Sequence, residues 1–408
     1  MRSFIFKGAL LNILHARTLI LLVIISFSNS VFSQIAPART WTELKEAITE
    51  RVNAQRYPLT GFDPKEVTQI LTNISSLDRD EWAKSWMNSG NRLFLEAKAS
   101  EANDKEKARE LYLSSWRYHS FGAWPTQNSA GKVLAHAKAT EAFRAYARLS
   151  DPKIEVLRIP FEGREITAYL QRPTGTSKPP VVISIGGLDS YKEFVVEQYG
   201  PGYLKKGLAY VAIDMPGTGE SPVKIDVDSE RIFSRVIDAL QQRNDIDSQR
   251  IGLQGVSWGG HWAARMAISE AKRLKAVVNW GGPVHDYFQS DWQIKALGTR
   301  EYLFDLFEAR ASVYGVKTLN EFLAYGPRMS LKDSGAINKP TAPQLLVNGE
   351  KDTQVPIADL YLVLKSGTTA KEAWVNPTGG HIGRNKDWSD AQIFENVITP
   401  WFAAKLNN

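Results

Sequence analysis

The 408-residue chain contains no cysteine. This absence excludes a thiol nucleophile, thiolate metal ligands and any disulfide framework, so a catalytic nucleophile has to be sought among other side chains. A chain without thiols is suited to an oxidising compartment, although their absence does not require one.

The chain also has little excess charge of either sign. Lys and Arg together number 50 and Asp and Glu 44, which gives a formal net charge of +6. Three basic residues, Arg2, Lys7 and Arg17, lie in a segment that we expect to be removed, which leaves about +3. This balance gives no reason to expect a nucleic acid or acidic lipid as a partner. With 43% hydrophobic and 11% aromatic residues, the chain has the composition of a folded globular protein.

Residues 1–33 are typical of a secretory signal peptide. Basic residues precede an apolar run at residues 19–27, and Val31-Phe32-Ser33 offers a cleavage position. We expect cleavage near Ser33-Gln34, a secreted or periplasmic location and no stable membrane insertion afterwards. The apolar run is short for a bilayer span. The long, apolar start of the segment nevertheless leaves an uncleaved membrane anchor as the alternative.

Residues 34–150 form a predicted helical domain. Apolar residues recur at intervals of three to four along residues 81–99, 104–121 and 130–149, and Asp63-Pro64 is a helix-start signal. No glycine-rich phosphate loop and no cluster of metal ligands occurs in this part of the sequence.

Residues 151–408 indicate an α/β domain. Residues 154–159 and 166–170 flank a turn and predict a hairpin. Later apolar runs are typical of strands buried in a parallel sheet, with helical stretches between them, and lie at residues 180–185, 209–213, 250–254, 274–280 and 344–347. Such alternation predicts a doubly wound, mostly parallel sheet. Residues 283–340 interrupt it, and we interpret this aromatic, helical insert as a lid over the carboxyl edge of the sheet.

The sharpest motif is Gly255-Val256-Ser257-Trp258-Gly259, between a predicted strand and a predicted helix. A G-x-S-x-G in this position is a nucleophile elbow, in which a tight turn exposes the serine and the glycines avoid collisions. Outside that context the same pattern is an ordinary turn. Ser257 is therefore the candidate nucleophile.

A serine nucleophile needs a base and an acid, which follow it in the order Ser, Asp, His in proteins with this elbow. His381 follows the last predicted strands in a glycine-flexed loop, so it is the candidate base. Asp352 follows the strand at residues 344–347 and is the candidate acid that orients the imidazole. Glu350 is the competing acid.

Two backbone N–H groups are candidates for an oxyanion hole. Trp258 opens the helix after Ser257, and Gly187 lies in the loop after an early strand, within Ile185-Gly186-Gly187-Leu188-Asp189. The loop after the next strand contains Asp214, which we interpret as structural rather than catalytic.

Together these residues resemble the α/β-hydrolase superfamily, and specifically its FrsA-like esterase group, in which a helical domain precedes the catalytic domain. The similarity covers most of the chain beyond residue 80. Besides the elbow, the stretches that carry it are Ala108-Arg109-Glu110-Leu111-Tyr112-Leu113 with Tyr118, Gly186-Gly187-Leu188-Asp189-Ser190-Tyr191-Lys192-Glu193, Asp214 to Ser221, and Leu274-Lys275-Ala276-Val277-Val278 with Gly282-Pro283-Val284-His285.

The group includes esterases, fungal enzymes that shorten pigment polyketides, and dihydroxypseudooxynicotine hydrolase, which cleaves a carbon–carbon bond. The resemblance implies an α/β-hydrolase fold and the triad Ser257, Asp352 and His381, with no cofactor. The nicotine-pathway enzyme has an additional acid after its paired glycines, which would fall on Asp189, with Glu193 as the other candidate. At that place this sequence has aspartate instead of glutamate.

The helical domain and the lid are expected to enclose an aromatic substrate pocket. Its candidate wall residues are Tyr118, His119 and Trp124, for which the competing interpretation is ordinary interdomain core. The leading function is cleavage of a carboxylic ester of a small molecule through an acyl-enzyme. A C–C hydrolase acting on a β-diketone or aryl ketone and a non-catalytic binding protein are the alternatives. The resemblance is compatible with a homodimer.

Overall fold

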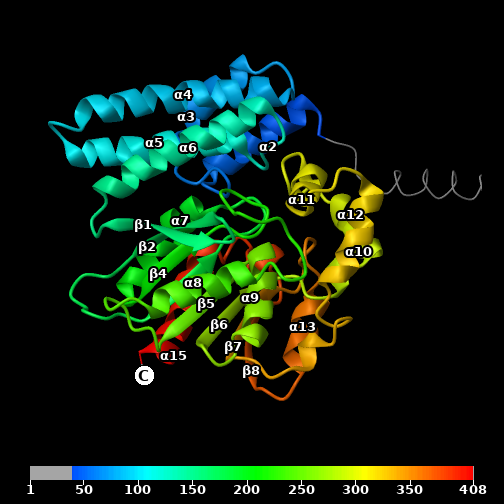
Figure 1. Cartoon of the computed structure of the whole chain (residues 1–408). Helices are drawn as coiled ribbons and strands as arrows, with labels where there is room; N and C mark the ends of the chain where they lie inside the picture. Colours follow the sequence, from blue (N-terminus) through cyan, green and yellow to red (C-terminus); the bar gives the residue numbers. More distant parts are fainter. Residues whose placement is uncertain (1–38, 408) are drawn as a thin grey trace, which may run out of the picture.

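The computed structural model describes residues 39–407, so the predicted signal segment lies outside the described residues. Helices before residue 150 lie above a sheet that has helices on both faces (Figure 1). This arrangement confirms the predicted α/β class. None of the helices between residues 39 and 407 is long and apolar enough to cross a membrane.

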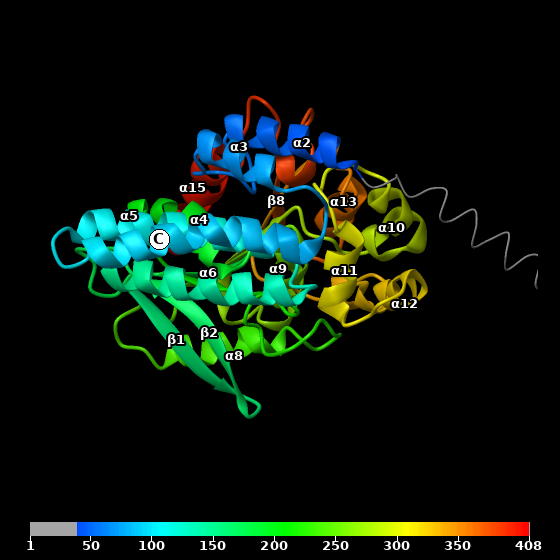
Figure 2. The ribbon, with the colours of Figure 1, turned by 90° about the horizontal axis from the view of Figure 1, so that it is seen from above.

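The helical region contains α2 (Trp41–Asn53), α3 (Pro64–Asn73), α4 (Arg79–Ser100), α5 (Lys105–Ala123) and α6 (Ala130–Leu149). Each helix begins after a polar side chain that accepts a hydrogen bond from a backbone N–H of the first turn, which stabilises the helix start. These capping residues are Thr40, Asp63, Asp78, Asp104 and Ser129. Helices α4, α5 and α6 lie side by side when the molecule is seen from above (Figure 2).

The sheet has eight strands in the order β1-β2-β4-β3-β5-β6-β7-β8. Strands β1 and β2 form the predicted hairpin, β2 pairs antiparallel with β4, and all later neighbours are parallel. The bounds are β1 Ile154–Phe161, β2 Arg164–Gln171, β3 Val181–Ile185, β4 Ala209–Ile213, β5 Ile251–Val256, β6 Leu274–Trp280, β7 Gln344–Gly349 and β8 Lys371–Asn376. The hairpin turns at Glu162 and Gly163, whose φ angles of 48° and 74° suit a tight two-residue turn.

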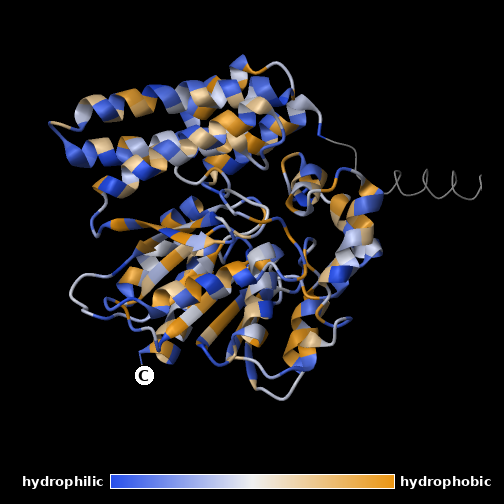
Figure 3. Cartoon of the chain, viewed as in Figure 1, coloured by the Kyte–Doolittle hydropathy of each residue, from blue (hydrophilic) through white to orange (hydrophobic). Residues whose placement is uncertain are grey.

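Helices cover both faces of the sheet. One face packs against α8 (Arg231–Gln241), α9 (Trp258–Ser269) and α13 (Ile357–Lys365), and the other against α6, α7 (Lys192–Lys205) and α15 (Thr399–Leu406). The central strands are mostly apolar, and every residue of β3, β4 and β5 is buried. Figure 3 shows this apolar centre between helices whose outer faces are hydrophilic. Burial on both faces explains the continuous apolar runs of the sequence.

The insert at residues 283–340 is helical, as predicted. Its α-helices are α10 (Ser290–Leu297), α11 (Leu306–Tyr314) and α12 (Leu319–Tyr325), and α11 lies near one end of α4 and α6 (Figures 1 and 2). Arg79 Nε pairs with Asp305 Oδ2 at 2.9 Å. The Phe304 ring lies 4.9 Å from that of Trp82, edge to face. The insert is therefore held to the helical region as well as to the sheet.

Candidate active site

Ser257 occupies the turn between β5 and α9 in a strained conformation. Its φ is 53° and its ψ is −122°, a region that costs a side-chain-bearing residue about 1–3 kcal/mol. The Ser257 N–H donates to the carbonyl of Trp280 at 2.7 Å, which ties the turn to β6. The predicted elbow is thus present in the backbone geometry.

Two glycines make this turn possible by allowing backbone to approach backbone. A Cβ on Gly255 would lie 1.9 Å from the carbonyl oxygen of Gly259, and one on Gly259 would lie 2.4 Å from that of Gly186. Neither neighbour is the end of a flexible side chain, so neither can move away. The elbow therefore requires glycine at both positions.

His381 and Asp352 meet Ser257 in a continuous hydrogen-bonded chain. His381 Nε2 lies 2.8 Å from Ser257 Oγ, and His381 Nδ1 lies 2.8 Å from Asp352 Oδ2. Asp352 is fixed by further donors, because its Oδ1 accepts from the N–H groups of Gln354 at 2.7 Å and Val355 at 3.0 Å. The side chain of Asp352 is fully buried, and that of His381 is 10% exposed. The geometry is that of a nucleophile, a base and an orienting acid.

Glu350, the competing acid, lies elsewhere. Its side chain is exposed and accepts a hydrogen bond from Tyr361 at 2.8 Å. The backbone turns at residues 349–352, so only Asp352 faces His381. Between the two acids, the structure brings Asp352 to the imidazole.

The two expected oxyanion donors differ in their surroundings. Trp258 is the first residue of α9, and the first N–H groups of a helix have no intrahelical acceptor. Gly187 lies next to Ser257, since a Cβ there would be 3.2 Å from Ser257 Cβ. However, its N–H donates to Ser190 Oγ at 2.7 Å. An oxyanion donor at Gly187 would require this serine to share or release the N–H.

A cavity of about 590 Å³ adjoins Ser257 and His381. It lies between the helical region, the insert and the carboxyl edge of the sheet. Its other lining residues are Arg51, Tyr57, Trp124, Gly187, Asp189, Ser190, Phe194, Tyr199, Val256, Glu301, Tyr302, Ile382, Arg384 and Asp390. The insert therefore contributes Glu301 and Tyr302 to the wall of the cavity.

Asp189 lies in this cavity among aromatic donors. Its Oδ2 accepts from Trp124 Nε1 at 2.9 Å, and its backbone carbonyl accepts from the Tyr57 hydroxyl at 3.0 Å. The Tyr302 ring stacks on that of Trp124 at 5.5 Å. Burial raises the pKa of Asp189, although hydrogen bonds from Tyr302, Tyr57 and Trp124 oppose this effect. Asp189 and Ser257 thus line the same cavity.

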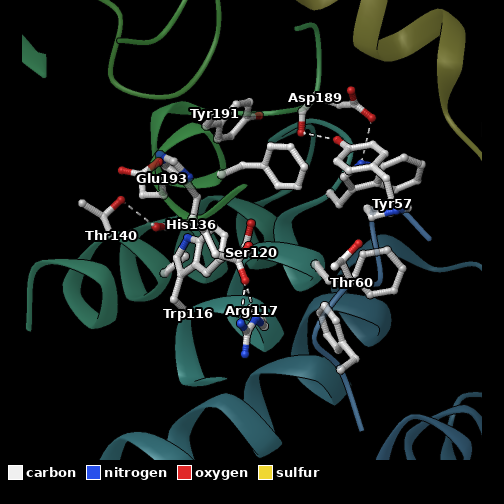
Figure 4. Close-up of a pocket in the computed structure, with 17 residues that line it drawn as sticks. Tyr57, Thr60, Trp116, Arg117, Ser120, His136, Thr140, Asp189, Tyr191 and Glu193 are labelled. Carbon is white, nitrogen blue, oxygen red and sulfur yellow. Dashed lines mark hydrogen bonds and ion pairs between the residues drawn. The ribbon is translucent and has the colours of Figure 1, made fainter. Parts of the chain in front are cut away.

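A second cavity of about 560 Å³ lies behind Tyr57, Trp124, Asp189 and Phe194, which line both cavities. Figure 4 shows its wall: residues of the helical region lie on one side and the segment from Asp189 to Glu193 on the other. The Tyr57 and Phe194 rings, 4.9 Å apart and nearly perpendicular, are part of the partition between the cavities.

Glu193 faces a buried ionic cluster instead of the cavity with Ser257. Lys192 Nζ lies 3.0 Å from Glu193, 2.8 Å from Asp214 and 2.9 Å from Glu220. Burial alone would lower the pKa of Lys192, but these carboxylates raise it well above its usual range. Asp214 also accepts from the N–H groups of Lys192 and Glu220. As expected, Asp214 supports the structure. Glu193 belongs to the same ionic cluster and lines only the second cavity.

Tyr118 and His119 do not line the cavity that contains Ser257. Tyr118 packs in the core of the helical region, 4.9 Å from the Phe62 ring. His119 lies against Gly90 of α4 and is 1% exposed. The helical period identified both residues as buried but could not show which element each one faces. Both lie in the interior of the helical region instead of the wall of this cavity. Trp124, in contrast, is a wall residue.

Several wall residues had no sequence signal. Arg51 and Tyr57 come from the helical region, Glu301 and Tyr302 from the insert, and Arg384 from the loop of His381. None belongs to a motif, because tertiary packing assembles them. In residues 39–407, no group of three or more His, Cys, Asp or Glu side chains is arranged to hold a metal ion.

Comparison with known proteins agrees with this fold. A family model described as "Esterase FrsA-like" matches residues 46–387. The chain is 26% identical over 347 residues to an esterase FrsA of Photobacterium profundum, covering 80% of this chain and 82% of the relative. It is 30% identical over 331 residues to an esterase FrsA of Vibrio vulnificus, covering 76% and 78%.

Solved structures have the same architecture. A 2,6-dihydroxy-pseudo-oxynicotine hydrolase aligns with a TM-score of 0.72 at 24% identity, over 85% of this chain and 93% of that chain. AbyA5 aligns with a TM-score of 0.65 at 22% identity, over 83% and 94%. The chain therefore belongs to the FrsA-like esterase family, and its family and its α/β-hydrolase fold together identify it as a hydrolase.

Proposed function

We propose that the protein is a serine hydrolase that cleaves a carboxylic ester through Ser257, His381 and Asp352. The observation that carries this proposal is the pair of 2.8 Å contacts that join Ser257 to His381 and His381 to Asp352 beside a cavity. A hydroxyl becomes nucleophilic when a neighbouring base accepts its proton, and the base needs an acid to hold its tautomer.

In the first half-reaction, Ser257 Oγ attacks the ester carbonyl carbon while its proton passes to His381 Nε2. The negative charge that develops on the carbonyl oxygen is stabilised by the N–H of Trp258 and a donor from the Gly187 loop. The protonated imidazole, held by Asp352, then gives its proton to the leaving alkoxide. An alcohol departs and the acyl group remains on Ser257.

In the second half-reaction, water replaces the alcohol. His381 Nε2 accepts a proton from the water as its oxygen attacks the acyl carbon, and the proton returns to Ser257 Oγ when the carboxylic acid leaves. The helical region, the insert and the loop of His381 all contribute side chains to the cavity beside Ser257, and a concave pocket of this kind is typical of small-molecule sites. We therefore propose an ester of a small molecule as the substrate.

The test is hydrolysis of p-nitrophenyl esters of short and medium acyl chains by the protein and by its Ser257→Ala variant. The matched control is Ser234→Ala, since Ser234 lies on α8 and donates to Glu270 at 2.6 Å, away from the cavity. We expect turnover by the wild type and the control and at least a 10³-fold loss in Ser257→Ala. Equal turnover by Ser257→Ala would contradict the proposal. If the wild type shows no turnover and a fluorophosphonate, which reacts with activated serines, does not label Ser257, the binding-protein alternative is favoured.

A C–C hydrolase is the second candidate, and Asp189 is the observation that favours it. Cleavage of a β-diketone or aryl ketone releases a carbanion that has to be protonated, and burial raises the pKa of Asp189 beside the nucleophile. The Asp189→Asn variant separates the two functions. Loss of ketone cleavage with ester cleavage retained would support this second function, whereas equal effects on both substrates would contradict it.

We further propose export of the protein. The support is the sequence pattern of residues 1–33, so the experiment is to locate the tagged full-length chain by cell fractionation. An exported, shortened protein is the expected result, and a membrane-bound protein of full length would favour the uncleaved anchor.

A further inference from the structure

The insert brings one carboxylate to the loop that holds His381. Glu301 lies between α10 and α11 and lines the cavity with Ser257 and His381. Its Oε1 pairs with Arg384 Nη2 at 3.0 Å. Arg384 stands three residues after His381 in the same loop, and its Nη1 lies 3.3 Å from Asp390 Oδ2. A carboxylate of the insert therefore forms an ion pair with the loop that carries the proposed base, His381.

The backbone around Glu301 is held in place from the helical region. Arg51 donates to the carbonyl of Glu301, and Arg39 donates to the carbonyls of Tyr302 and Leu303. At the same segment, Arg300 pairs with Glu43 of α2 at 2.8 Å. These contacts hold the backbone that carries Glu301 against the helical region.

We propose that Glu301 and Arg384 are positioning residues that together set the proton affinity of His381. This inference rests on the proposed function, in which His381 takes and returns a proton. Loss of the Glu301 carboxylate would disfavour a protonated imidazole at this cavity, and loss of the Arg384 guanidinium would favour one. Because the two charges are paired, each offsets the effect of the other.

The other charged groups that face His381 have fixed partners of their own. Asp352 binds Nδ1, Asp390 pairs with Arg384, and Arg51 donates to backbone carbonyls. Asp189 accepts from Trp124, and burial raises its pKa. None of these four groups belongs to the insert at residues 283–340.

The ionised state of Glu301 agrees with this arrangement. Burial would raise the pKa of Glu301, but Arg384, His381 and Arg51 outweigh burial and lower it. For Arg384, burial would lower the pKa, but Asp390 and Glu301 raise it. Both members of the pair are therefore charged near neutral pH.

The experiment measures the acid limb of the kcat/KM profile, which reports ionisation of the free enzyme. Glu301→Gln removes a negative charge from the wall of the cavity that His381 lines, so we expect the limb to move to lower pH by about half a unit to one unit. Arg384→Gln leaves the carboxylate, so the limb is expected to move to higher pH by a similar amount. The double variant removes both charges and is expected to return close to the wild type.

Arg300→Gln is the matched control. It loosens the same segment by breaking the pair with Glu43 but removes no charge from the cavity wall. We expect its acid limb to coincide with that of the wild type, and thermal melting identifies any variant that is not folded. Shifts of Glu301→Gln and Arg384→Gln in the same direction, or no shift in either, would overturn the inference.

A second readout does not depend on ester turnover. Titration of the low-field proton resonance of His381 in the same variants follows the imidazole directly. Opposite displacements there support the inference even if no ester is cleaved, and coincident titrations overturn it. Failure of the proposed function, in contrast, appears as wild-type turnover that survives Ser257→Ala.

Discussion

Replacement of Asp352 by asparagine removes one charge from the proposed triad while keeping the shape of the side chain. The carboxylate accepts from four donors: His381 Nδ1 and Asn348 Nδ2 on Oδ2, and the N–H groups of Gln354 and Val355 on Oδ1. An amide has one accepting and one donating end, so it satisfies only one side of this arrangement.

The backbone N–H groups cannot change their role, so we expect the new amide oxygen to face them and the new NH₂ to face His381. Asn348 can turn its amide to match, because its Oδ1 has no partner among the described residues. His381 then has to accept at Nδ1, which puts the proton on Nε2, where it can no longer take one from Ser257. The expected loss in kcat is about 10⁴-fold, or about 5 kcal/mol.

The assay is p-nitrophenyl ester hydrolysis near neutral pH with Asp352→Asn, compared with Glu350→Gln. Glu350 is exposed and bonds to Tyr361, so its substitution is expected to change kcat by no more than about twofold. Thermal melting of both variants checks that they are folded. An Asp352→Asn variant within about tenfold of the wild type, or a large loss in Glu350→Gln, would refute the assignment of the acid.

Three further predictions concern the pocket, stability and the amino terminus. Phe194→Ala opens the partition between the two cavities, so kcat/KM is expected to rise for esters with longer acyl chains relative to acetate esters. An unchanged dependence of kcat/KM on acyl-chain length would show that Phe194 does not separate the two cavities. Burial lowers the pKa of His119 to about 4 and that of His261 to about 3. Unfolded histidines titrate near pH 6.5, so the unfolded state binds more protons than the folded state below that pH. The free energy of unfolding is therefore expected to fall as the pH drops from about 6.5 toward 4, by about 2 kcal/mol per histidine at pH 5. Guanidinium unfolding at pH 7.5 and pH 5 measures this fall, and equal stabilities would contradict it. Mass spectrometry of the exported protein is expected to find Gln34 as the first residue, and an intact amino terminus would disprove cleavage.

The main elements of the fold were predictable from the sequence because burial on both faces leaves a continuous apolar run. The strands β4 and β6 coincide with predicted runs, and β3, β5 and β7 differ by one or two residues at their ends. Asp63 before Pro64 marked the start of α3 for a local reason, since its side chain accepts from the N–H of Lys65 at 2.9 Å.

The proposed triad was recognisable because each member follows a strand of a parallel sheet, so the order of strands brings the loops to one edge. Local spacing could not show that the Gly187 N–H is engaged by Ser190, which depends on how the loop closes. Nor could helical periodicity separate Trp124, which faces the cavity, from Tyr118, which packs in the helical core. Glu301 and Arg384 meet only after the insert has folded back onto the sheet.

The most direct test of the central claim is the reaction of the purified protein with a fluorophosphonate, followed by mapping of the modified peptide. A fluorophosphonate forms a covalent bond with a serine only when that hydroxyl is activated by its base. The account predicts one modified residue, Ser257, with labelling abolished in Ser257→Ala and slowed in His381→Ala. Labelling of another serine, or none at Ser257 in the folded protein, would contradict it.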